Sequence, residues 1–329
     1  MRLTLPILTS LTCLTAVSTT LAATQGQIVP VAIYTGLDAP FGLAYDPNRD
    51  AIWYSHNGAN YNFDTVRPFT SFTPAELSGL TKDSRGVYII GNGTTAKSYS
   101  LETYLNTASL AFDNAIDRII AQVPGEARLV EVDPNFVFDP GNPDALPWDE
   151  NSSYRPGSAP FVPPLPPVSD GLDVDGSDVF WSPEKGSVYK NGVLFIDKSN
   201  PAQKVPGQTI DEGIAGVEKA GDLVYTVSRF SDVNGPRSRT IAAYDADTGE
   251  LLAYDPDGDE TAFRWEDMTF DGRYLYVTDP VGNQDPNDPA GDIYVFEFII
   301  TPVPEPSTVI GAAVMGLLAG ASVLRRNRK

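Results

Sequence analysis

Residues 42–54 read GLAYDPNRDAIWY, and this pattern is the main indication of the fold. A mostly apolar run leads into a turn rich in Asp, Pro and Asn, and a second apolar run ends in an aromatic pair. The same cadence returns in four further segments, namely 79–89 (GLTKDSRGVYI), 171–181 (GLDVDGSDVFW), 216–225 (GVEKAGDLVY) and 267–277 (DMTFDGRYLYV). Each copy predicts a strand, a tight turn and a second strand.

Further predicted strands follow several copies and extend them to meanders of about four strands. Asn191-Gly192 within 187–196 is a strong two-residue hairpin turn, and 240–254 holds a second turn at Asp247–Glu250. Meanders at this spacing predict an all-β fold, a β-propeller of five or six blades. A strand over 28–35 is expected to close the ring by pairing with 292–300. The alternatives are a β-sandwich or two stacked β-domains.

Two segments break the repeat. Residues 101–123 place apolar side chains on one helical face and polar ones on the other, with Ser100 as a cap and Pro124-Gly125 as a stop, which predicts one helical insertion. Residues 139–168 are rich in proline and show little periodicity, which predicts a long loop. Loops of this length often cover a binding face.

Both ends of the chain are typical of targeting segments. Arg2 followed by an apolar stretch and small residues near Ala22 and Ala23 predicts a signal peptide over 1–23, handled by the Sec translocon and signal peptidase. The uncharged run 307–324 is long enough to form a transmembrane helix, and cations follow it. We expect a body over 24–302 that lies outside the cytoplasm.

The tail resembles a known sorting signal. Its residues are Val303, Pro304, Glu305, Pro306 and Ser307, then the apolar run, then Arg325 and Arg326. This order is similar to the PEP-CTERM signal of Gram-negative bacteria over 303–329. The resemblance implies an exosortase as partner, an inner-membrane-anchored precursor, and delivery to the cell surface or extracellular matrix, often beside exopolysaccharide.

Composition narrows the chemistry of the body. The chain carries a formal net charge of −20, which makes nucleic acid an improbable partner. Its single cysteine, Cys13, lies within the predicted signal peptide, so thiol catalysis and cysteine metal sites are excluded from the mature body. A single histidine, His56, is the candidate general base, with an ordinary loop residue as the alternative.

The opening repeat gives a second, vaguer resemblance. Residues 39–46 (APFGLAYD), followed by 52–58, look like the start of blades in NHL-type and streptogramin-lyase-like propellers. Related propeller hydrolases hold an axial divalent metal with Glu, Asn and Asp, but no complete ligand set transfers to this sequence. An enzymatic role therefore stays open.

Calcium is the candidate cofactor. Asp255, Asp257 and Asp259 alternate, and Glu266 follows at a spacing that imitates a twelve-residue calcium loop. Two other acidic clusters lie at 173–178 and 279–292. Asp and Gly also dominate ordinary β-turns, which is the alternative for all three clusters.

We therefore expect an exported, non-enzymatic binding or structural propeller associated with exopolysaccharide. The alternative is a propeller lyase or metal-dependent hydrolase acting on a small ester or a polysaccharide. Five aromatic residues of the repeat are expected to form blade cores, namely Trp53, Tyr54, Trp181, Tyr225 and Tyr276.

Overall fold

The computed structural model describes residues 24–56, 68–91, 98–102, 107, 109–123, 128–137, 141–142, 145–149, 153–154, 169–183, 186–206, 213–229, 240–255, 265–280 and 290–300. The predicted signal peptide and the whole of 303–329 lie outside these residues. In the described part of the chain, no helix has the length and hydropathy to span a bilayer. All the regular structure described is β-strand.

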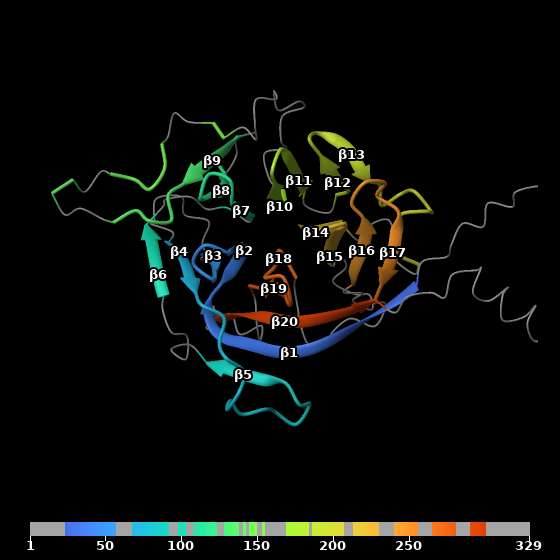
Figure 1. The fold of residues 1–329 in the computed structure, drawn as a ribbon, viewed down its shortest axis with the longest axis horizontal. Helices are drawn as coiled ribbons and strands as arrows, with labels where there is room; N and C mark the ends of the chain where they lie inside the picture. The colour runs from blue at the N-terminus through green and yellow to red at the C-terminus, as the bar shows by residue number, and fades with distance from the viewer. Residues whose placement is uncertain are drawn as a thin grey trace, which may run out of the picture.

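The strands form a β-propeller of five blades (Figure 1). Blade 1 contains β2 (Pro40–Asp46), β3 (Ala51–His56), β4 (Pro68–Phe72) and β6 (Ser98–Glu102). Blade 2 contains β7 (Leu110–Asp113), β8 (Arg118–Gln122) and β9 (Leu129–Val132). Blade 3 contains β10 (Ser169–Asp175), β11 (Asp178–Pro183), β12 (Val188–Lys190) and β13 (Val193–Ile196).

The remaining two blades are joined into one nine-stranded sheet. Blade 4 contains β14 (Gly213–Ala220), β15 (Leu223–Arg229), β16 (Ile241–Asp245) and β17 (Leu251–Tyr254). Blade 5 contains β18 (Met268–Phe270), β19 (Leu275–Asp279), β20 (Ala290–Ile300), β1 (Thr24–Asp38) and β5 (Tyr88–Gly91). The link is a short parallel pairing of the first residues of β1 with β17.

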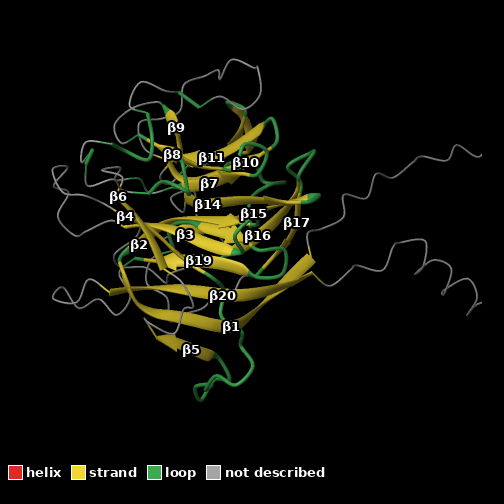
Figure 2. Ribbon diagram, turned by 60° about the vertical axis from the view of Figure 1, so that its left-hand side comes forward, coloured by secondary structure: helices red, strands yellow, loops and turns green. Residues whose placement is uncertain are grey.

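The ring closes as predicted. Strand β1 pairs antiparallel with β20 from Gly26↔Ile300 to Asp38↔Ala290, so the first strand and the last strand share one blade. Both long strands cross the lower part of Figure 1, and Figure 2 shows the same pair stacked beneath β19. The predicted hairpin at Asn191-Gly192 is also present, with positive φ at both residues.

The core consists of five apolar clusters, one between each pair of neighbouring blades. In every blade the second strand directs one large side chain toward the next blade, namely Trp53, Ile120, Phe180, Tyr225 and Tyr276. The aromatic residues of the repeat are therefore core, as expected. Trp181 points the other way and packs against blade 2.

Two sequence interpretations were wrong, namely the helix predicted over 101–123 and the inner hairpin predicted over 79–89. The helix predicted over 101–123 is absent from its described residues, where β7 and β8 form the inner hairpin of blade 2. Residues 109–121 read SLAFDNAIDRIIA, a repeat copy whose four-residue turn at 114–117 also fits a helical periodicity. Asp117 has φ +56°, which breaks a helix. Conversely, 79–89 is no inner hairpin and leads into β5 at the outer edge of blade 5.

The described parts of the proline-rich segment cover the edge of blade 2. Asp133 N–H donates to Pro147 O at 2.8 Å, and Tyr154 N–H donates to Leu129 O at 2.8 Å. Trp148 forms an isolated bridge with Val132 of β9. This segment shields an otherwise open strand edge, which protects it from pairing with other chains.

Candidate functional site on the propeller axis

The five inner strands approach one another closely around the axis. Glycine occupies the same position near the start of three of them, Gly42, Gly171 and Gly216. A Cβ on Gly171 would lie 2.3 Å from Ala215 O, and one on Gly216 would lie 2.8 Å from Met268 N. Only glycine permits this approach, because backbone cannot move aside as a side-chain end can.

Asp267 occupies the equivalent position in blade 5 and fills the axis with a carboxylate. Its Oδ2 accepts the N–H of Leu43 at 2.9 Å and that of Leu110 at 3.4 Å, and its Oδ1 accepts the N–H of Met268 at 2.9 Å. The residue is 0% exposed, and burial raises its pKa well above the ordinary range. One side chain thus connects blades 5, 1 and 2.

Two residues further along the inner strands, three side chains repeat this arrangement. Asp173 accepts the N–H of Lys219 at 2.9 Å. Glu218 accepts the N–H of Phe270 at 3.2 Å. Thr269 accepts the N–H of Tyr45 at 3.0 Å. Each blade from 3 to 5 therefore binds the backbone of the next blade at the same level.

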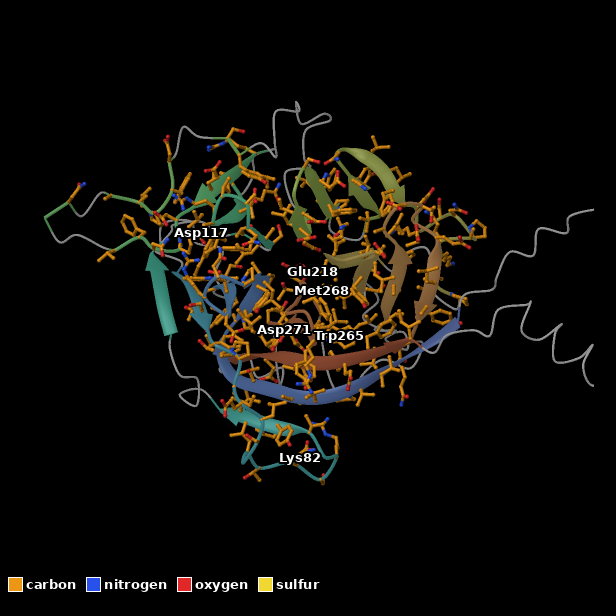
Figure 3. All side chains as sticks on the ribbon, in the orientation of Figure 1. Lys82, Asp117, Glu218, Trp265, Met268 and Asp271 are labelled. Carbon is orange, nitrogen blue, oxygen red and sulfur yellow. The ribbon has the colours of Figure 1, made fainter. Side chains whose placement is uncertain are left out.

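The carboxyl groups of Asp173, Glu218 and Asp267 lie close enough to interact near the centre of the ring, where Figure 3 shows Glu218 and Met268. Burial raises the pKa of Asp173 to about 6, and the nearby charge of Asp175 adds to the shift. Enclosure likewise raises the pKa of Glu218, and the charge of Asp173 raises it further. Lys219 Nζ pairs with Asp175 at the end of the row. Burial at the axis therefore favours the protonated form of the Asp173 and Glu218 carboxyl groups.

Hydroxyl groups on the second strands add a further link between blades. Ser55 donates to Thr107 O at 2.7 Å, Ser182 to Ala215 O at 2.5 Å, and Thr278 to Phe41 O at 2.8 Å. Each carbonyl lies at the start of the next inner strand. Hydrogen bonds from both the first and second strands therefore hold the ring together.

His56 lies at the end of β3, and the structure makes it a partly enclosed strand residue. Its Nε2 lies 2.6 Å from Thr70 Oγ1, and its ring stacks on Tyr54 with centroids 4.8 Å apart. The residue is 8% exposed. A general base needs access to a substrate proton, and this position gives little.

The predicted calcium residues are only partly described. Asp257 and Asp259 lie outside the described residues. Asp255 accepts the N–H of Ile28 through Oδ2 at 2.5 Å, so it fastens β1 to the end of β17. Glu266 is fully buried.

The two other acidic clusters have separate roles. In the first, Asp173 faces the axis, while Asp175 and Asp178 pair with Lys219 and Lys190. In the second, Asp279 lies opposite Asp292 across β19 and β20, and burial raises the pKa of Asp292 to about 6. Within the described ranges, no group of three or more His, Cys, Asp or Glu side chains is arranged to hold a metal ion.

Sequence reasoning did not select Glu218 or Asp267 as site residues. A signal was present, because Asp267 replaces the glycine of the repeat at a position where a side chain reaches the axis. The sorting residues are Val303, Pro304, Glu305, Pro306, Ser307, Arg325 and Arg326, and all lie outside the described residues.

Comparisons with known proteins give distant likenesses. No protein-family model matches the chain, and no curated protein matches it. A tail fibre of Staphylococcus aureus phage P68 aligns at 16% identity and TM-score 0.44, over 83% of this chain and 53% of that one. This chain therefore spans about half of the tail-fibre chain.

Two solved enzymes align over a similar share of the chain. A PQQ-bound aldose sugar dehydrogenase from Streptomyces coelicolor has 11% identity and TM-score 0.40, over 84% of this chain and 99% of that one. A gluconolactonase from Xanthomonas campestris has 10% identity and TM-score 0.35, over 83% and 90%. The chain is a β-propeller by its own five blades.

Proposed function

We propose that this chain is an exported β-propeller, sorted by an exosortase through residues 303–329, that acts as a binding or structural component of the cell surface or extracellular matrix. The proposed ligand class is exopolysaccharide. In this proposal a precursor is held at the inner membrane by 307–324 before the tail is processed.

The extent of the fold carries the sorting part of the proposal. The described ring runs from Thr24 in β1 to Ile300 in β20, so it lies between the predicted signal peptide and the Pro-Glu-Pro segment. Both segments can be removed without cutting the ring.

The axis supports the non-catalytic part of the proposal. Three acids that converge there, Asp173, Glu218 and Asp267, accept backbone N–H groups of neighbouring blades. Asp173 Oδ2 and Glu218 Oε1 each accept one such N–H, and Asp267 uses both of its oxygens, so these acids serve as links that hold the inner strands in place. This arrangement favours a binding module over the lyase or metal-dependent hydrolase.

The sorting claim is tested by expression of the full chain in a Gram-negative host that contains an exosortase. Replacement of Pro304, Glu305 and Pro306 by alanine should leave an unprocessed precursor in the inner membrane, while Pro302→Ala should be processed as the natural chain is. Equal processing of all three chains would contradict sorting through this motif.

The ligand claim needs its own assay. The body over 24–302 should co-sediment with exopolysaccharide purified from such a host and remain soluble without it. A body that stays in the supernatant at every polysaccharide concentration would overturn this ligand class and leave the sorting result untouched.

A further inference from the structure

The ring-closing strand β1 is paired on both of its edges. Strand β20 covers one edge over almost the whole length of β1. Strand β5 covers the other edge in parallel, from Ala32↔Tyr88 to Thr35↔Gly91. The middle of β1 is therefore held between β20, the last of the described strands, and β5, a strand from the first third of the chain.

Strand β5 belongs in sequence to blade 1, since it lies between β4 and β6. It leaves that blade and adds a fifth strand to blade 5, at the bottom of Figure 1. Two apolar side chains anchor it: Val87, just before the strand, is buried between blades 4 and 5, and Ile90, within the strand, is buried between blades 5 and 1. Ala75 N–H also donates to Tyr34 Oη at 2.9 Å.

The apolar cluster around Ile90 is mostly local in sequence. Of its eleven buried members, eight lie within residues 32–90, namely Ala32, Tyr34, Leu37, Leu43, Ile52, Tyr54, Phe72 and Ile90. The other three, Tyr276, Ile293 and Val295, come from β19 and β20. The first 90 residues thus supply most of a buried cluster before β19 and β20 are added.

The two partners of β1 differ greatly in sequence distance. Ala32 pairs with Tyr88 across 56 residues and with Val295 across 263 residues. The entropy of loop closure makes the nearer pairing roughly tenfold more probable. Contacts close in sequence also form earlier during folding.

We propose that β5 pairs with β1 early in folding and keeps it in position until β20 pairs with it and closes the ring. It binds β1 as soon as the N-terminal residues are available, covers one edge and part of its apolar surface, and presents the other edge to β20. Closure then adds one strand to a preformed template. This inference is independent of sorting and of any ligand, and it holds for folding during export or in solution.

Tyr34 provides a matched test, because it pairs with Ile90 on one side and with Ile293 on the other. Both isoleucines are buried in the same cluster, at 1% and 0% exposure. The body over 24–302 is unfolded in urea and refolded by rapid dilution, with unfolding rates measured in parallel. Ile90→Ala should slow refolding roughly tenfold and leave unfolding almost unchanged.

Ile293→Ala should instead refold within about twofold of the natural rate and unfold faster. Ile90→Val and Ile293→Val replace the alanine pair if either alanine variant fails to fold, with the same pattern at smaller amplitude. Equal slowing by the two variants, or slower refolding by the β20 variant alone, would overturn the proposal.

Discussion

Asp267 and Leu43 lie 224 residues apart in sequence and are joined by a 2.9 Å hydrogen bond from the Leu43 amide to Oδ2. The bond connects blade 5 to blade 1 at the axis, where Asp267 is fully buried. The protonated carboxyl that burial favours resembles an amide in shape and charge. Its structural role is therefore separable from its acidity.

Replacement of Asp267 separates these properties. Asp267→Ala removes the acceptor and leaves the N–H groups of Leu43 and Leu110 unpaired, so we expect a loss of about 3 kcal/mol in the free energy of unfolding. Asp267→Asn keeps one acceptor oxygen for the N–H groups of Leu43 and Leu110 but loses the one that accepts Met268 N–H, so it should cost about 1 to 2 kcal/mol. Urea unfolding of both variants gives the comparison, and an alanine variant as stable as the asparagine variant would exclude the role described for Asp267.

Gly171→Ala tests the close approach of blades 3 and 4. The added Cβ would lie 2.3 Å from Ala215 O and 2.7 Å from Val217 N, both backbone atoms. We expect a loss of about 3 kcal/mol or more, because the two inner strands must separate. Ser177→Ala in the exposed turn between β10 and β11 is the control and should change stability by less than about 0.5 kcal/mol. Similar melting curves for the two variants would show that the blades are not in close contact.

Arg49 connects blades 1 and 2 away from the axis. Its guanidinium binds Asp46 at 2.7 Å, both carboxylate oxygens of Asp117 at 2.8 Å, and Asn135 at 2.8 Å. This planar group matches a carboxylate in a way that lysine does not. We expect Arg49→Lys to lower the free energy of unfolding by about 1 kcal/mol and Arg49→Ala by about 2 kcal/mol.

The control is Arg85→Ala, because Arg85 pairs with Asp83 inside one exposed turn and should contribute less than about 0.5 kcal/mol. Calorimetric melting of the three variants would detect these differences. If Arg85→Ala lowered the stability as much as Arg49→Ala, the hydrogen bonds of Arg49 between blades 1 and 2 would not contribute more than an ordinary surface ion pair.

Much of this fold was predictable, because strand, turn and strand alternate with side chains of fixed direction. The copies at 42–54, 171–181, 216–225 and 267–277 all form inner hairpins, and β1 closes the ring with β20. The inner hairpin of blade 2 was predicted as a helix because turn 114–117 is as long as one helical turn. The apolar residues of the two flanking strands therefore recur with helical spacing.

The axial site was less accessible to sequence reasoning. Asp173 and Glu218 lie in repeat copies where an acid next to a turn looks like turn chemistry. Their convergence depends on the ring geometry, which brings side chains from three blades to one axis. Asp267 was the exception, since a charged residue at a glycine position of a repeat marks a site where a side chain replaces close backbone contact.

The most direct test of a structural axis is the pH dependence of stability in Asp173→Asn. Burial raises the pKa of Asp173 from its ordinary 3.8 to about 6, so the folded chain binds an extra proton between these pH values. The contribution of Asp173 to the free energy of unfolding of the natural chain is therefore lost as pH rises through that window. Asparagine keeps the acceptor for Lys219 N–H and does not titrate.

The measurement is the difference in free energy of unfolding between Asp173→Asn and the natural body, by urea unfolding from pH 4 to pH 8. Taking the difference removes the contribution of carboxylates that do not interact with Asp173, and Glu218, whose pKa the charge of Asp173 raises, changes the difference in the same direction. The difference should be near zero at pH 4 and rise to on the order of 3 kcal/mol in favour of Asp173→Asn at pH 8. A difference that stays constant with pH, or that grows in favour of the natural chain, would contradict a structural role for the axial carboxylates.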